Sequence, residues 1–135
     1  MKTIATYIAL ICFCAFAKAQ NETSKEEIKH TVEIKLGVGE SQKINDIKIT
    51  FLRVIEDSRC PKDVDCVWAG QAKIRVLVEE KGIDPVEKEL TFSSPAKTIY
   101  IHKSDALAIK AVRLSPYPET SLATSKRVYY LELQG

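Results

Sequence analysis

Histidine is scarce in this chain, and the motifs of the common catalytic centres are missing. The 135 residues include two histidines, His30 and His102, and neither stands beside an acid or a nucleophile in a recognisable spacing. There is no G-x-S-x-G, no H-E-x-x-H and no glycine loop of the kind that cradles phosphate. Acids scattered along strands are ordinarily solvated. We therefore expect neither an enzyme nor a cofactor.

An excess of charge of one sign is also missing. The chain has 20 basic and 18 acidic residues, interspersed along its length. Cleavage of the N-terminal leader described next would remove Lys2 and Lys18 and leave 18 basic residues (20 − 2) against 18 acidic ones. This balance provides no electrostatic footprint for nucleic acid or for anionic lipid, so neither is expected as a partner.

Long apolar runs are absent except at the N-terminus. A short basic start, Met1-Lys2, precedes an apolar run from Ile4 to Phe16, and Ala17-Lys18-Ala19 then matches a signal-peptidase cleavage site. The run is too short for a membrane span. We predict a signal peptide over residues 1–19, and hence export to the periplasm or the medium. Residues 20–30 are polar and charge-rich, and we expect them to be flexible.

Cysteine is rare, and two of the four cysteines, Cys12 and Cys14, lie in the predicted leader. The exported chain would keep Cys60 and Cys66, and an oxidising compartment favours a disulfide between them. Their spacing exceeds that of a zinc knuckle or a C-x-x-C redox pair, and no second Cys or His pair follows. A ring of about seven residues contributes roughly 2.4 kcal/mol, so the bridge is expected to staple one loop.

The segment 57–70 around these cysteines holds the only tryptophan of the chain. Trp68 is expected to lie over the edge of the core beside the bridge, and Gly70 to let the backbone pass close to a neighbouring segment. The acids of this segment could offer oxygens to calcium, but the order of an EF-hand loop is missing. No metal site is predicted, although calcium stays open as an alternative to solvated acids. These acids are Asp57, Asp63 and Asp65.

From Thr31 onward, apolar and polar residues alternate with the period of half-buried strands. The pattern is clear over residues 72–78, and over residues 47–55 it places Ile47, Ile49, Phe51 and Ile55 on one face. About seven or eight short strands at intervals of about ten residues, without a helical period, predict an all-β fold. We expect a single domain over residues 31–135, an antiparallel β-sandwich or a small barrel.

Three short segments resemble a known group of proteins. Asp57-Ser-Arg-Cys-Pro, Cys66-Val-Trp-Ala-Gly and Leu114-Ser-Pro-Tyr-Pro are similar, in this order, to segments of small secreted bacterial β-proteins that carry an R-C-P…C-x-W-x-G motif. Many proteins of this group have no assigned function. The resemblance covers about half of the chain, from Ile47 on. It implies an extracytoplasmic β domain in a bacterium and brings no catalytic residue with it.

The constrained loop suggests a non-catalytic binding or envelope-associated module, because a loop fixed in advance loses less entropy when a partner docks. Polar contacts to an envelope or extracellular protein would come from Arg59, Lys62, Asp63 and Asp65, and an aromatic contact from Tyr117. The simpler alternative is that these charges pair with each other in solvent and that Tyr117 packs on its own prolines. Another alternative is a protease inhibitor that presents the loop from Arg59 to Cys66 as a substrate mimic. The sequence leaves the oligomeric state open.

Overall fold

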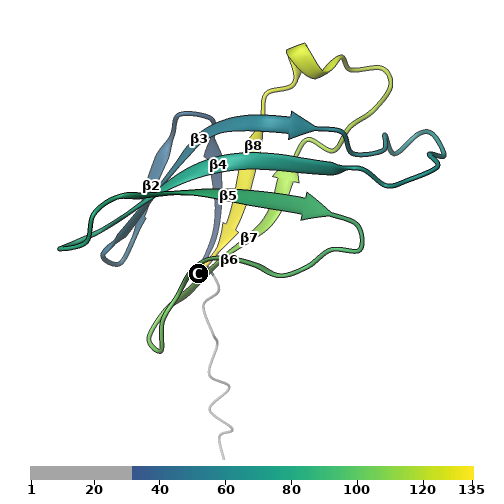
Figure 1. The fold of residues 1–135 in the computed structure, drawn as a ribbon. Coiled ribbons are helices and arrows are strands. Elements are labelled where there is room, and N and C mark those ends of the chain that lie inside the picture. The colour runs from purple at the N-terminus through teal and green to yellow at the C-terminus, as the bar shows by residue number, and fades with distance from the viewer. Residues whose placement is uncertain (1–31) are drawn as a thin grey trace, which may run out of the picture. The chain divides into compact units, whose positions relative to one another are not determined.

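Eight antiparallel strands form two four-stranded sheets in the computed structural model, which describes residues 32–135 (Figure 1). The only helical element in these residues is a 3-10 turn, η2, at Thr124–Lys126. The strands are β1 Glu33–Gly37, β2 Ser41–Ile44, β3 Ile47–Asp57, β4 Gln71–Glu80, β5 Val86–Ser93, β6 Ile99–Lys103, β7 Ala108–Ser115 and β8 Tyr130–Gln134. The all-β prediction is thus confirmed.

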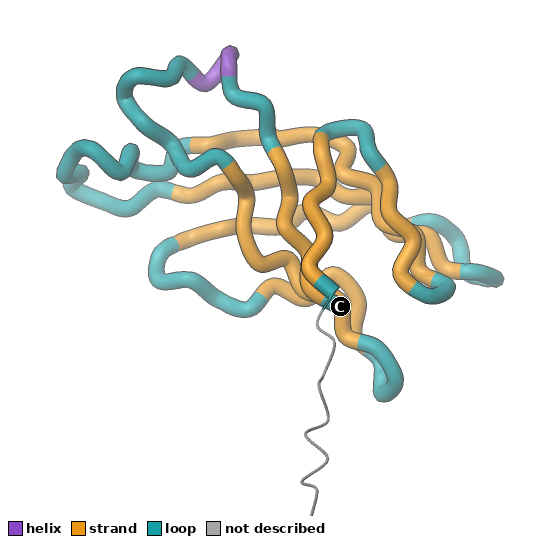
Figure 2. The backbone as a smooth tube through the Cα atoms, turned by 180° about the vertical axis from the view of Figure 1, so that it is seen from behind, coloured by secondary structure: helices purple, strands orange, loops and turns teal. Residues whose placement is uncertain are grey.

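The two sheets face each other across a single core. One sheet has the strand order β1-β8-β7-β6 and the other the order β2-β3-β4-β5. Figure 2 shows the strands of both sheets from behind. Apolar side chains of both sheets belong to one buried cluster, including Phe51 and Ile74 from one sheet and Ile109 and Leu131 from the other. Because the strands form two separate ladders, the fold is a sandwich and not a closed barrel.

Alternation along the strands correctly predicts most of the buried positions. Ala72, Ile74, Val76 and Val78 all point into the core from β4, as expected. In β3 the prediction is wrong for Ile55, which is 42% exposed, whereas Val54 packs against the core instead. Two register irregularities, between Phe51 and Arg53 and between Val54 and Glu56, change the facing of the residues that follow them. Such bulges leave no mark on the period-two pattern.

The long connection between β3 and β4 forms one end of the sandwich. β3 and β4 pair from Ile47↔Glu80 to Asp57↔Ala72, and residues 58–70 continue beyond the last pair as a loop. The segment after β7 reaches the same place from the other sheet, because Lys62 N donates to Pro118 O at 3.0 Å. This end of the domain therefore brings together the predicted loop residues and the Ser115–Pro118 turn.

The predicted signal peptide over residues 1–19 and the predicted flexible segment over residues 20–30 lie outside the described residues. Within residues 32–135, no helix has the length and apolar character needed to cross a membrane.

Candidate functional site: the cysteine loop

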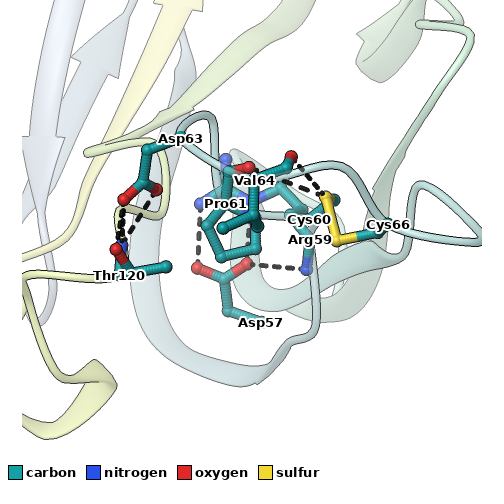
Figure 3. The surroundings of a disulfide bond; sticks show 8 residues. All are labelled: Asp57, Arg59, Cys60, Pro61, Asp63, Val64, Cys66 and Thr120. Carbon is teal, nitrogen blue, oxygen red and sulfur yellow. Dashed lines mark hydrogen bonds and ion pairs between the residues drawn. A yellow bond between two sulfur atoms is a disulfide. The ribbon is translucent and has the colours of Figure 1, made fainter.

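The loop over residues 58–70, called the cysteine loop below, is closed at its base by both backbone and sulfur. Ser58 N donates to Gln71 O and Cys60 N to Ala69 O, each at 2.8 Å, so the hairpin continues past its last regular pair. The predicted disulfide between Cys60 and Cys66 is present, with the two Cα atoms 5.9 Å apart (Figure 3). The bridge thus closes a small ring inside a loop whose base is already hydrogen-bonded.

Gly70 is the closing residue of this loop, and the backbone there requires a glycine. Its φ is +66°, and a Cβ at this position would lie 1.8 Å from the carbonyl oxygen of Ser58. The two arms of the loop therefore approach each other more closely than any side chain allows. This confirms the prediction that the backbone passes close by at Gly70.

Beneath the loop, Asp57 and Arg59 form a buried ion pair. Arg59 Nε donates to Asp57 Oδ1 at 2.7 Å and Arg59 Nη2 to Asp57 Oδ2 at 2.9 Å, a two-pronged contact (Figure 3). The Asp57 side chain is fully buried and the Arg59 side chain is 7% exposed. Tyr129 and Arg127, just before β8, add further donors to Oδ2 at 2.9 and 3.4 Å. One carboxylate therefore holds together residues that are up to 72 positions apart.

Arg59 also binds the backbone of the other sheet. Its Nη1 donates to Leu114 O at 2.8 Å and its Nη2 to Pro116 O at 3.1 Å. The guanidinium carbon lies 4.8 Å from the centre of the Tyr117 ring, within the range of a cation–π contact. Arg59 was expected to contact a partner; in the structure it instead ties the cysteine loop to the end of β7. Tyr117 packs on Arg59 but stays partly exposed.

The ion pair shifts the pKa of Asp57. Burial alone would raise this pKa, but the hydrogen bonds and charge of Arg59, together with the Tyr129 hydroxyl, outweigh it and hold the pKa below its ordinary value. Burial and the adjacent Asp57 carboxylate raise the pKa of Tyr129, so its hydroxyl remains a donor. Two guanidinium groups thus face one carboxylate, and Arg127 Nε is buried without a hydrogen-bond partner among residues 32–135. The cluster depends on the charge of Asp57.

A pH dependence follows from the lowered pKa of Asp57. The stability that its ionised form contributes is fully present above its pKa in the unfolded chain, about 3.9, and is lost as the pH falls through the lower folded-state pKa. Urea unfolding between neutral pH and pH of about 2 should show this component of stability disappearing below about pH 4. An Asp57→Asn variant should lack this component, and an unchanged acid dependence would contradict the assignment.

A second set of contacts holds Lys62 and Asp63 of the cysteine loop. The backbone N and the hydroxyl of Thr120 both donate to the Asp63 carboxylate, with the N to Oδ1 distance at 3.0 Å (Figure 3). These hydrogen bonds lower the pKa of Asp63. Lys62 Nζ forms an ion pair with Glu119. Lys62 and Asp63 were expected to contact a partner. In the structure, both instead bind residues of the segment after Pro118.

Trp68 does not lie where the sequence suggested. The prediction that its indole is buried beside the core is wrong, since Trp68 is 69% exposed. Val67 is fully exposed beside it, and Val64 is partly exposed. The reason is the glycine: the loop returns to the core only at Gly70, which is buried, while residues 62–69 are all exposed. We refer to Val64, Val67 and Trp68 as the apolar tip.

The acids of the loop do not converge. Asp57 points inward to Arg59, Asp63 binds Thr120, and Asp65 is exposed. Among residues 32–135, no group of three or more His, Cys, Asp or Glu side chains is placed to hold a metal ion.

Removal of the disulfide should have a modest effect. Cys60→Ser combined with Cys66→Ser is expected to lower the free energy of unfolding by about 2 kcal/mol, because the ring is small. The strands should keep their structure, since the hydrogen bonds at the base and tip of the loop do not involve sulfur. Chemical denaturation of the variant and of the reduced wild type, followed by circular dichroism, measures both quantities. A loss of β structure in either sample would contradict this expectation.

Sequence reasoning missed the partners of Asp57. Arg127 lies in a polar connection, and nothing in its spacing links it to residue 57. Tyr129 did carry a signal, because a tyrosine in phase with the apolar Leu131 and Leu133 is expected to be buried and then needs a polar partner for its hydroxyl. That signal shows that a partner exists without saying which one it is.

No protein-family model, curated protein or solved structure matches this chain. The function proposed below therefore rests on the geometry of the cysteine loop.

Proposed function

We propose that this domain is a non-catalytic binding module of an exported protein, and that the apolar tip of the cysteine loop contacts an envelope or extracellular protein. The observation that carries the proposal is the exposure of Trp68 on a loop that is held by hydrogen bonds at its base, by the disulfide and by the contact of Asp63 with Thr120. Tryptophan is enriched among the residues that dominate binding energy at protein interfaces. A held loop also loses little conformational entropy on docking.

The internal contacts change which residues are available to a partner. Arg59, Lys62 and Asp63 are occupied within the domain, and their role is to position the tip. Asp65 and Tyr117 remain exposed beside them and can supply polar and aromatic contacts at the rim. Export rests on the predicted leader and on the preference of a disulfide for an oxidising compartment.

Protease inhibition receives less support from the same geometry. Arg59 would have to leave its buried partner Asp57 and the carbonyls of Leu114 and Pro116 to enter a protease pocket. Lys62 is the one basic side chain of the loop that stays exposed, although it pairs with Glu119. Inhibition of trypsin-like proteases that is lost on Lys62→Ala would favour this function over the proposed one.

Trp68→Ala should separate stability from binding. Because the indole is mostly exposed, we expect the free energy of unfolding to fall by no more than about 0.5 kcal/mol. Binding to the partner should weaken by about 2 kcal/mol or more if Trp68 is its anchor. Ile83→Ala is the matched control, since Ile83 is 59% exposed in the turn between β4 and β5.

The partner can be sought with a photoreactive phenylalanine analogue placed at position 68 or at position 83. In cells that export the protein, position 68 should crosslink to a discrete partner and position 83 should not. The chain has one tryptophan, so a blue shift of its fluorescence on adding the purified partner reports contact at the tip. Equal crosslinking at both positions, or unchanged binding by Trp68→Ala, would refute the proposal.

A further inference from the structure

A groove opens between the two sheets on the side where β5 and β6 form their edges. Lys88 Nζ of β5 donates to Ile101 O of β6 at 2.7 Å and holds the two edges together at that point. Nearer the cysteine loop, β5 ends at Ser93, and the connection to β6 swings outward before the chain returns (Figure 1). The space left there is an open groove of about 250 Å³.

The walls of the groove are mostly apolar and come from both sheets and from the cysteine loop. Phe92 lies at the end of β5, Ile99 at the start of β6, and Val112 and Leu114 on β7. Tyr117 adds an aromatic ring, and at Gly70 the backbone itself lines the groove because there is no side chain. Such a surface suits the hydrocarbon or aromatic body of a small molecule.

The charged residues of the groove are all basic. Arg59, Lys97 and Arg113 line it, and no aspartate or glutamate does. Arg59 is neutralised by Asp57, and Arg113 uses its Nε to bind Glu132 at 3.1 Å. Lys97 makes no ion pair with any acidic residue between positions 32 and 135. Ser93 and Ser94 also line the groove.

We propose that this groove binds a small organic carboxylate, with its apolar body between Phe92, Ile99 and Val112 and its carboxylate at Lys97. The apolar walls and the one-signed charge of the rim each point to this class of ligand. The volume of about 250 Å³ suits a body of about eight non-hydrogen atoms, taking about 30 Å³ for each water-sized group. None of the three residues of the apolar tip lines this groove, although Tyr117 borders both surfaces, and the ligand does not depend on the proposed protein partner.

The test compares 3-phenylpropionate with 3-phenylpropanamide, which has the same shape and no charge. In a titration of the ¹⁵N-labelled protein, the carboxylate should shift the amide signals of residues 92–99 and 112–117. For so small a ligand we expect a Kd on the order of 1 mM. The neutral amide should bind about three- to five-fold more weakly, the contribution of an exposed ion pair.

Two variants assign the contacts. Lys97→Gln should bring the carboxylate down to the affinity of the amide, whereas Lys126→Gln in η2 should change neither. Val112→Trp should fill the groove and abolish the binding of both probes, and this exposed position should tolerate the larger side chain. Trp68→Ala should leave both affinities unchanged, which distinguishes this site from the apolar tip.

Several outcomes would overturn the proposal. They are equal affinity for the two probes, a charge preference that survives Lys97→Gln, signal shifts that map outside the groove, and no shifts up to the solubility limit of the carboxylate.

Discussion

Gly70→Ala is expected to lower the free energy of unfolding by about 3 kcal/mol or more, although it adds a single methyl group. A residue with a side chain costs about 1–2 kcal/mol in the left-handed region, and Gly70 has φ +66°. The added Cβ would also lie 1.8 Å from the backbone oxygen of Ser58, which cannot rotate away. To make room, the loop must break the hydrogen bonds that Ser58 N and Cys60 N donate across its base.

Two other glycines provide a matched control for this variant. Gly39 and Gly82 have φ of +84° and +82°, and a Cβ at either would meet nothing within 4 Å. Gly39→Ala and Gly82→Ala should therefore cost only the conformational term, about 1–2 kcal/mol. Urea unfolding of the three variants measures the difference. If Gly70→Ala cost no more than the two controls, the close approach of the loop arms would not matter for stability.

Asp57→Asn should also destabilise the domain strongly, by about 3–5 kcal/mol. The substitution keeps the shape of the side chain but removes the charge that faces Arg59 and Arg127, both of which are buried. It also replaces one acceptor oxygen by a donor NH₂ in a cluster where Arg127 Nε already has no partner among the described residues. Breaking one side of a buried pair leaves an uncompensated charge, which costs more than the pair itself contributes.

Asp63→Asn is the matched control, because it removes the charge of an exposed carboxylate in the same loop. Asp63 accepts hydrogen bonds from Thr120 but is exposed, so we expect its substitution to destabilise the domain much less than Asp57→Asn. Tyr129→Phe removes one donor to Asp57 and should cost about 1–2 kcal/mol. Thermal and urea unfolding at neutral pH rank the three variants. An Asp57→Asn variant as stable as Asp63→Asn would show that the buried pair is dispensable.

Gly70→Ala and Asp57→Asn should also affect the apolar tip. Gly70 closes the loop that carries Trp68 and Asp57 lies beneath it, and neither is part of the apolar tip. If the apolar tip is a docking surface, partner binding should weaken in both variants under conditions where the rest of the domain remains folded.

The sequence correctly predicted the features that depend on neighbouring residues. Alternation over residues 72–78 placed Ile74 and Val76 in the core. Alternation wrongly predicted that Ile55 faces the core, because a bulge changes the strand pairing without changing the alternation of apolar and polar residues. It also misplaced Trp68, because exposure in a loop depends on what covers the loop, and no local pattern encodes that.

By itself, the sequence determined that this chain forms strands, that residues 57–70 interrupt them, and that Cys60 and Cys66 can close a ring there, since backbone propensity and short spacings are local properties. Only the tertiary structure decided that Arg59 faces inward and Trp68 outward. Arg59 is buried because Asp57, the Leu114 and Pro116 carbonyls and Tyr129 come together from two sheets, and such a match of donors to acceptors exists only once the sheets have packed.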